Sequence, residues 1–237
     1  MLKVTKDTLI SVNANAGLIA WFDKRFQDGS VDIQYLVDAL LAGYEVTSAL
    51  WVFTTFRSLC ADVPQAREKI ITSAPLIMIM GSINAVDIHT PGAVYVAGSL
   101  SADCNVTAKS INANGIVADS MTVTNDIYSR GVIAIRKNLF AGGSIETTNG
   151  LHVQGDANFK QLQSQRSVVI EGNLHAMSVC SFKDIVVRGD ARIHEYIAAG
   201  QRLEINGKLK FTGPYPANVS AGFTLSGGGK AIIGSNR

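Results

Sequence analysis

Four histidines are the side chains best suited to acid–base chemistry near neutral pH. They are His89, His152, His175 and His194. A catalytic histidine needs a nucleophile, carboxylate or metal-binding partner at a suitable spacing, and the sequence has no HExxH, GxSxG, phosphate-loop or dinucleotide motif. The run from Gly227 to Lys230 lacks the earlier glycine and the following Ser or Thr of a phosphate loop. We therefore expect that the protein is not an enzyme.

Cysteines and carboxylates provide no clearer site. Cys60, Cys104 and Cys180 are widely spaced and fit no CxxC pattern, which predicts buried reduced thiols rather than metal ligands. The carboxylates expected to face outward are Asp156, Glu171, Asp190 and Glu204. Because basic residues alternate with them, they lack the clustering that glycoside cleavage requires. The sequence thus predicts no catalytic residue, no metal and no cofactor.

Charge is distributed unevenly along a chain whose net charge is only +2. Residues 1–75 carry −1, residues 76–129 carry −3 and residues 130–237 carry +6. The basic half predicts a surface that binds an acidic protein partner. Its candidate residues are Arg188, Arg192, Lys208, Lys210 and His175. Nucleic acid is a less suitable partner because stacking aromatic residues are nearly absent there. The alternative is a solvated surface with internal pairs such as Glu171 with Arg188 on the next repeat.

The elements that would position these residues come from a nine-residue unit with alternating apolar residues around a central position. Central residues of the clearest copies are Gly98, Lys137, Gly155, Gly172, Gly189 and Gly207. The last five are 18, 17, 17 and 18 residues apart. The 39-residue gap after Gly98 fits two looser copies, around Gly115 and Asn125. Residues 92–213 contain no proline, as continuous backbone ladders require.

This period predicts a mainly-β protein with a single-stranded β-solenoid, a parallel β-helix with one turn per 17 to 18 residues, over residues 76–212. We expect three short strands per turn, the third including pairs such as Val106 with Ala108 or Ile197 with Ala199. Glycine at the corners would permit a positive φ. About eight turns, spaced by ~4.8 Å, would form a rod about 40 Å long.

Residues 1–75 have helical periodicity and predict a small α-helical domain. The first helix covers residues 16–26 and ends at Asp28-Gly29. Ser30 is the expected N-cap of a second helix, which Gly43 closes. A third helix covers residues 45–56, and a short fourth runs from Pro64 to Ile70. Trp21 and Trp51 are expected to pack in the core of this domain.

Both ends of the solenoid would leave unpaired strand edges unless something covers them. We expect the helical domain to cover the first turn. Residues 213–237 are expected to form a C-terminal capping segment, with a turn around Pro214 and a closing strand from Gly222 to Leu225. Capped ends favour a discrete particle, whereas open ends favour self-association into a homo-oligomer or polymer.

The repeats over residues 80–211 resemble bactofilins, polymer-forming bacterial cytoskeletal proteins built on a right-handed β-helix. The resemblance implies a self-assembling scaffold. The folded helical domain departs from bactofilins, which usually have short disordered tails. The segment from Trp21 to Gly29, followed by Tyr35 to Leu40, is similar to a helical module ahead of β-repeats in phage and prophage proteins. That similarity implies an inhibitor of a bacterial defence complex that acts by direct protein contact.

Three function classes therefore remain. A non-catalytic protein-binding solenoid is the first, a bactofilin-like scaffold is the second, and an acyltransferase of the hexapeptide-repeat type is the third. The last would use His175 or His194 as a general base, but the repeat period is not six and hexad matches such as Ile197 to Gly200 are isolated.

Residues 1–10 lack the apolar core of a signal peptide, and the longest apolar run, Ala74 to Met80, is too short to span a membrane, so a cytoplasmic location is expected.

Overall fold

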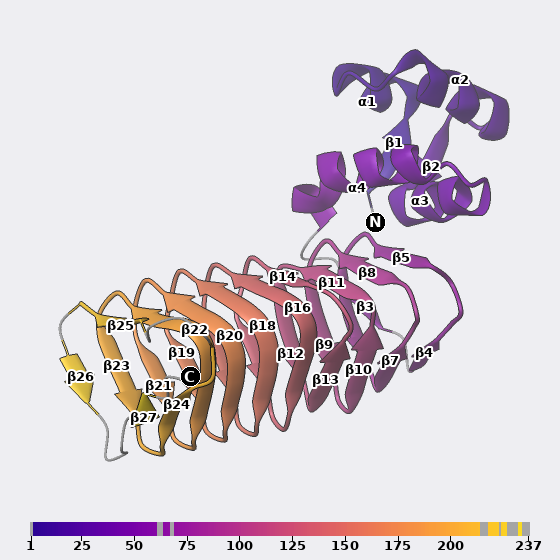
Figure 1. Cartoon of the computed structure of the whole chain (residues 1–237). Coiled ribbons are helices and arrows are strands. Elements are labelled where there is room, and N and C mark those ends of the chain that lie inside the picture. The colour runs from indigo at the N-terminus through magenta and orange to yellow at the C-terminus, as the bar shows by residue number, and fades with distance from the viewer. Residues whose placement is uncertain are drawn as a thin grey trace.

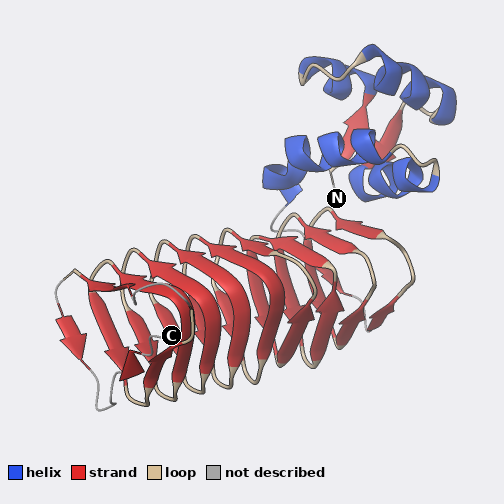
Figure 2. Cartoon of the chain, in the orientation of Figure 1, coloured by secondary structure: helices blue, strands red, loops and turns tan. Residues whose placement is uncertain are grey.

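A helical region precedes a β-solenoid of about eight turns in the computed structural model of the chain (Figures 1 and 2). The structure describes residues 2–60, 64–66, 69–213, 218–222, 224–226 and 232–233. Strands hold 50% of the residues and helices hold 20%. The predicted mainly-β class with a parallel solenoid is confirmed.

The helical region contains four helices and one two-stranded antiparallel ribbon. The ribbon pairs β1 (Lys3–Thr5) with β2 (Ser30–Asp32). The helices are α1 (Lys6–Ser11), α2 (Ala16–Arg25), α3 (Ile33–Ala42) and α4 (Val46–Cys60). Gly29 has a φ of 72° in the turn after α2, and Gly43 is the C-cap of α3, both at predicted turn positions.

Two local predictions for this part of the chain are wrong. The N-cap of α3 is Asp32, whose carboxylate accepts a hydrogen bond from the Gln34 backbone N–H at 2.9 Å. Ser30 belongs to β2 instead, since pairing with Thr5 extends the chain there. The helix expected from Pro64 is replaced by β3 (Pro64–Ala66) and β4 (Lys69–Ile71), which pair in parallel with strands of the next turn.

The solenoid has three faces, and each turn contributes a strand or half-strand to each. Face 1 contains β3, β6 (Ser82–Ala85), β9 (Ser99–Ala102), β12 (Gly115–Ala118), β15 (Ile133–Ile135), β17 (Leu151–Val153), β19 (Val168–Ile170), β21 (Ile185–Val187), β23 (Arg202–Ile205) and β26 (Thr224–Ser226). Face 2 begins with β4, β7 (Asp87–His89), β10 (Asn105–Ala108) and β13 (Ser120–Val123) and ends with β24 (Leu209–Phe211) and β27 (Ile232–Ile233). Face 3 begins with β5 (Leu76–Ile79), β8 (Ala93–Val96), β11 (Ser110–Ala113) and β14 (Ile127–Ser129) and ends with β25 (Asn218–Ala221).

Four long strands bend from face 2 onto face 3 in the later turns. These are β16 (Leu139–Thr147), β18 (Ala157–Ser164), β20 (Leu174–Ser181) and β22 (Ala191–Ala199). Their first halves pair along face 2 and their second halves along face 3, with register shifts in β16–β18 and β20–β22. The prediction of three separate short strands per turn therefore holds only for the earlier turns.

Strand register confirms the predicted period in the later turns. On face 1, Ile133 pairs with Leu151, which is followed in register by Val168, Ile185 and Leu203, at intervals of 18, 17, 17 and 18 residues. The alignment of the earlier turns is wrong. Gly98 lies between faces 3 and 1, because Val96 is on β8 and Leu100 is on β9, whereas Lys137 lies between faces 1 and 2. The two residues predicted for the third strand of their turns also lie on different faces, since Val106 is on face 2 and Ile197 is on face 3.

Inward side chains of all three faces form one continuous apolar core. It is built of stacked Ile, Leu, Val, Met, Ala and Phe residues, from Ile70 to Phe211. A row of buried hydroxyls completes the corner between faces 3 and 1, and it consists of Ser129, Thr147, Ser164 and Ser181. Each accepts a hydrogen bond from the backbone N–H two residues later, as Ser164 does from Arg166 at 3.2 Å. The hydroxyls satisfy turn groups that would otherwise be buried without a partner.

The helical region covers the outer side of face 3, not the end of the first turn (Figure 1). Met78, Met80 and Ala97 point outward from the solenoid and are buried in the helical core. The Gln34 side chain fixes this contact, because its amide donates to the Met78 carbonyl at 2.9 Å and accepts from the Met80 N–H at 2.7 Å. Trp21 and Trp51 are partly buried against the same cluster. The predicted end cap is thus replaced by a side contact.

At the other end, the ladder continues through β25, β26 and β27, which pair with β22, β23 and β24. The turn predicted around Pro214 lies outside the described residues, as do the glycines at 227–229. Of the closing strand predicted from Gly222 to Leu225, Thr224 and Leu225 lie in β26, whereas Gly222 follows the end of β25. The three cysteines are free thiols as predicted, but only Cys60 is buried, while Cys104 is exposed and Cys180 is half-buried.

Candidate functional site

Outward side chains on face 2 form a row that crosses successive turns. Strand register places Phe140, Asn158, His175, Arg192 and Lys210 one above another, and all five are exposed. Adjacent hydrogen-bonded strands lie about 4.8 Å apart, so the row becomes cationic toward its C-terminal end on a rigid, closely spaced support. We call these five residues the face-2 row. Three of the five predicted binding residues, His175, Arg192 and Lys210, are members.

A second row borders the face-2 row at the corner between faces 1 and 2. It consists of Asn138, Asp156, Asn173, Asp190 and Lys208. Each Asn or Asp Oδ1 accepts a hydrogen bond from the backbone N–H of the next member, at 2.9, 2.7, 2.9 and 2.8 Å in order. Lys208 completes this series, which we call the corner ladder. The hydrogen bonds fix the carboxylates of Asp156 and Asp190 along the edge of the candidate site.

The corner ladder explains the glycines at this corner. A Cβ on Gly172 would lie 2.5 Å from the Asp156 Oδ1 and 2.6 Å from the Gly155 carbonyl oxygen. Gly155, Gly189 and Gly207 have equally close neighbours in the preceding turn. Positive φ angles among the described glycines occur only at Gly29 and Gly150, so the expected positive φ at these corners is wrong. Glycine is required here because successive turns approach each other too closely for a side chain.

Arg188 lies outside the face-2 row. Its Nε is 2.5 Å from Glu171 Oε2, which confirms the predicted pair across adjacent turns. The same carboxylate is 3.7 Å from the Nε2 of His152 on face 1. Glu171 therefore offsets the charge of Arg188, and the structure separates this residue from the other four candidates.

The remaining cations of the site have no such neighbour. No described carboxylate oxygen lies within 4.0 Å of the side-chain nitrogens of Arg192, Lys208 or Lys210. In an earlier turn, by contrast, Asp119 contacts Arg136 at 2.6 Å and Lys137 at 2.8 Å. The hydrogen bond from Lys137 lowers the pKa of the Asp119 carboxyl, and the neighbouring Arg136 charge lowers it further. Stacked like charges repel each other, so the later cations would be stabilised by an external anion.

A shallow groove of about 430 Å³ lies beside the face-2 row. Its lining includes Phe140 on β16, Asn158 and Lys160 on β18, His175 and Met177 on β20, and His194 on β22. His175 and His194 both line this groove. A half-exposed aromatic ring, a thioether and several hydrogen-bond donors are suited to contact with a protein surface.

The described residues offer little for metal or covalent chemistry. They contain no group of three or more His, Cys, Asp or Glu side chains arranged to hold a metal ion. His175 and His194 share the groove with Lys160, and His175 also lines a neighbouring hollow with Asp156, Asp190 and Arg192. The arrangement can donate hydrogen bonds and attract negative charge.

Comparison of the chain with protein-family models, with curated proteins and with solved structures finds no match. The class that the structure shows is a β-solenoid with an N-terminal helical region. The resemblance to bactofilins and that to phage proteins receive no further support from these comparisons. Among the described residues, no helix is both long enough and apolar enough to cross a bilayer.

Sequence reasoning missed two features of the site. The hydrogen-bonded corner ladder has a signal, since Asn or Asp follows four successive corner positions from Lys137 to Gly189. The groove on face 2 has no local signal, because it depends on how the long strands bend toward face 3.

Proposed function

We propose that this protein is a non-catalytic binding protein whose solenoid presents a basic surface to an acidic surface of a partner protein. The observation that carries this proposal is the stacking of His175, Arg192 and Lys210 on successive turns of face 2. Lys208 adds a fourth basic group at the adjacent corner.

The geometry of the support favours binding over solubility as the role of this surface. Scattered surface charges usually alternate in sign, as Arg202 and Glu204 do at 3.2 Å on face 1. The later members of the face-2 row instead place like charges on neighbouring rungs, which opposes folding unless a partner offsets it. A rigid strand scaffold holds the positions of the cations before binding, and this lowers the entropic cost of association.

In its more specific form, the proposal is that the partner belongs to a bacterial defence complex and that binding blocks it. The support for this form is the similarity of the segment from Trp21 to Leu40 to helical modules of phage β-repeat proteins. The cationic surface is compatible with it, because blocking by direct contact requires complementary charge rather than a catalytic group.

Charge reversal tests the proposal. Each exposed ion pair contributes roughly 0.2–1 kcal/mol, and reversal replaces attraction with repulsion, so Arg192→Glu with Lys210→Glu should weaken binding about tenfold or more. The matched control is Arg166→Glu with Lys183→Glu, which reverses two cations on adjacent turns at the corner between faces 3 and 1. Quantitative affinity capture should lose the partner only with the face-2 variant. Equal capture by both variants would contradict the proposal.

A self-assembling scaffold is the second candidate, and a specific observation favours it. In the described residues, β3, β4 and β5 of the first turn are paired only with β6, β7 and β8. The helical region lies beside this turn, so one edge of the stack has backbone groups available to another chain. Negative-stain microscopy and sedimentation distinguish the candidates, because a scaffold gives filaments and a binding protein gives uniform small particles.

A further inference from the structure

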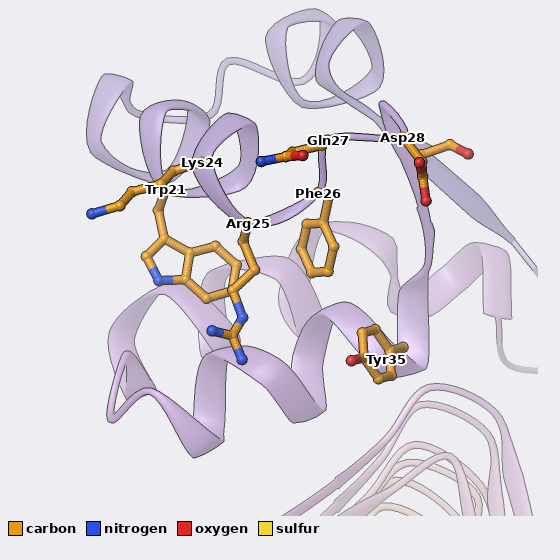
Figure 3. A pocket seen from close by; sticks show the side chains of 8 residues that line it. Trp21, Lys24, Arg25, Phe26, Gln27, Asp28 and Tyr35 are labelled. Atoms are coloured by element: carbon orange, nitrogen blue, oxygen red, sulfur yellow. The ribbon is translucent and has the colours of Figure 1, made fainter.

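A second recognition site lies in the helical region, away from the face-2 row. A cleft of about 780 Å³ lies between the end of α2 and the start of α3. Its lining residues are Trp21, Lys24, Arg25, Phe26, Gln27, Asp28, Ser30 and Tyr35 (Figure 3). This volume is within the range of about 300–1,000 Å³ that is usual for ligand-binding clefts.

An aromatic cluster connects the core of the helical region to this cleft. Phe22 is fully buried, and its ring centroid is 5.1 Å from that of Phe26. Phe26 makes edge-to-face contacts with Trp21 at 5.8 Å and with Tyr35 at 6.1 Å. The Tyr35 side chain is 60% exposed. The inner rings are therefore held in place by packing, while Tyr35 offers a large apolar surface to a ligand.

The charges of the cleft are divided between its two ends. Lys24 and Arg25 lie near Trp21, and Asp28 lies at the other end (Figure 3). The Arg25 guanidinium carbon is 5.9 Å from the centroid of the Trp21 ring, a cation–π geometry. Within the described part of the chain, no carboxylate oxygen lies within 4.0 Å of the Lys24 or Arg25 nitrogens. The neighbouring Asp23 is already bound to Lys6 at 2.5 Å.

We propose that this cleft binds a short segment of a partner protein in which an aromatic or aliphatic side chain is adjacent to an Asp or Glu. The apolar side chain packs against Phe26 and Tyr35, and the carboxylate binds Arg25 beside Trp21. Arginine, tryptophan and tyrosine are the residue types that contribute most to binding at protein interfaces. The site is independent of the face-2 row, since none of its residues belongs to the solenoid.

The surrounding charge favours a peptide over a nucleic acid. Residues 1–75 contain eight acidic and seven basic residues, so a phosphate backbone would meet net repulsion in this region. Asp28 within the cleft adds to that repulsion. A single carboxylate directed at Arg25 and Lys24 experiences local attraction, because exposed charges further away are screened over about 8–10 Å.

Selection from a phage-displayed library of random 12-residue peptides on the full-length protein tests this proposal. The enriched peptides should contain an aromatic or aliphatic residue next to Asp or Glu. A synthetic peptide from this set, labelled for fluorescence anisotropy, should bind Arg25→Glu and Tyr35→Ala at least tenfold more weakly than the unaltered protein. Arg166→Glu and Tyr44→Ala are the controls, because Arg166 is an exposed arginine on the solenoid and Tyr44 is a 92% exposed tyrosine outside the cleft.

A second measurement reports on the cleft directly. The chain has two tryptophans, so Trp51→Phe leaves Trp21 as the sole indole, and its emission should change when the peptide binds. Enrichment of no peptide, enrichment of basic peptides, or binding that the cleft variants leave unchanged would overturn the proposal. Binding of a labelled single-stranded RNA that Arg25→Glu abolishes, without any peptide binding, would also overturn it.

Discussion

Substitution of a corner glycine provides a direct test of how closely the turns pack. In Gly172→Ala, the new Cβ would lie 2.5 Å from Asp156 Oδ1 and 2.6 Å from backbone atoms of Gly155. The backbone cannot move away without disturbing the ladder, in which Asp156 Oδ1 accepts from the Asn173 N–H at 2.7 Å. Overpacking of this kind costs about 1–3 kcal/mol, and the lower entropy of the unfolded chain offsets about 0.4–1 kcal/mol.

The expected net loss is about 1–2 kcal/mol, which corresponds to a fall in Tm of roughly 2–8 °C for a chain of this size. Gly115→Ala is the matched control, because the nearest atom to its Cβ is the Ser99 Oγ at 3.3 Å and the backbone is further away. Thermal unfolding followed by circular dichroism measures both variants, and amide hydrogen exchange at Asn173 reports on the ladder itself. If Gly172→Ala and Gly115→Ala unfold at the same temperature, close packing of the turns is not the reason for the glycine.

Two further predictions concern the contact between helices and solenoid and the ion pairs of the earlier turns. Gln34→Ala removes the amide that bonds the backbone of Met78 and Met80 and leaves these buried groups unpaired, which should lower the free energy of unfolding by about 1–3 kcal/mol. Amide hydrogen exchange at Met80 should become faster, and unchanged exchange would contradict this role of Gln34. Asp119 has a lowered pKa, so its contribution to stability is fully present above the ordinary Asp pKa and is lost as pH falls through the lowered value. A carboxyl NMR titration should show Asp119 protonating below the usual Asp range, and Lys137→Ala should raise its pKa toward that range while Arg136 still lowers it. An ordinary pKa in the unaltered protein would contradict the ion pair of Asp119 with Lys137 and Arg136.

The later turns could be predicted from the sequence because glycine marks the same corner four times, from Gly155 to Gly207. The earlier turns were aligned wrongly because all three faces share the pattern of alternate apolar residues. A glycine such as Gly98 at a different corner then satisfies the same nine-residue unit. The identity of a face depends on strand register, which connects residues one turn apart and is not written in any local segment.

One segment of the sequence indicates where the helical region packs on the solenoid. The run from Ala74 to Met80 is apolar at consecutive positions, not at alternate ones. A strand buried on one face needs only alternate apolar residues, so a continuous run indicates cover on both faces. Met78 and Met80 supply the outer surface against which the helices pack.

The candidate site was predicted in part. His175, Arg192 and Lys210 were expected on one basic surface, and strand register places them in one row because outward positions repeat with each turn. The groove beside them, and the cleft between α2 and α3, depend on bends and helix packing that no spacing in the sequence expresses.

The central claim is that the face-2 row contacts a partner protein, and site-specific photo-crosslinking tests it most directly. Phe140 belongs to the row and is 44% exposed, while Phe182 is 72% exposed and lies at the corner between faces 3 and 1. Replacement of each exposed phenylalanine by p-benzoylphenylalanine adds a benzoyl group to the ring and places the same reactive group on two surfaces. We predict a covalent partner adduct from position 140 that Arg192→Glu with Lys210→Glu abolishes, and none from position 182. An adduct from position 182 alone, or no adduct from position 140, would contradict the claim.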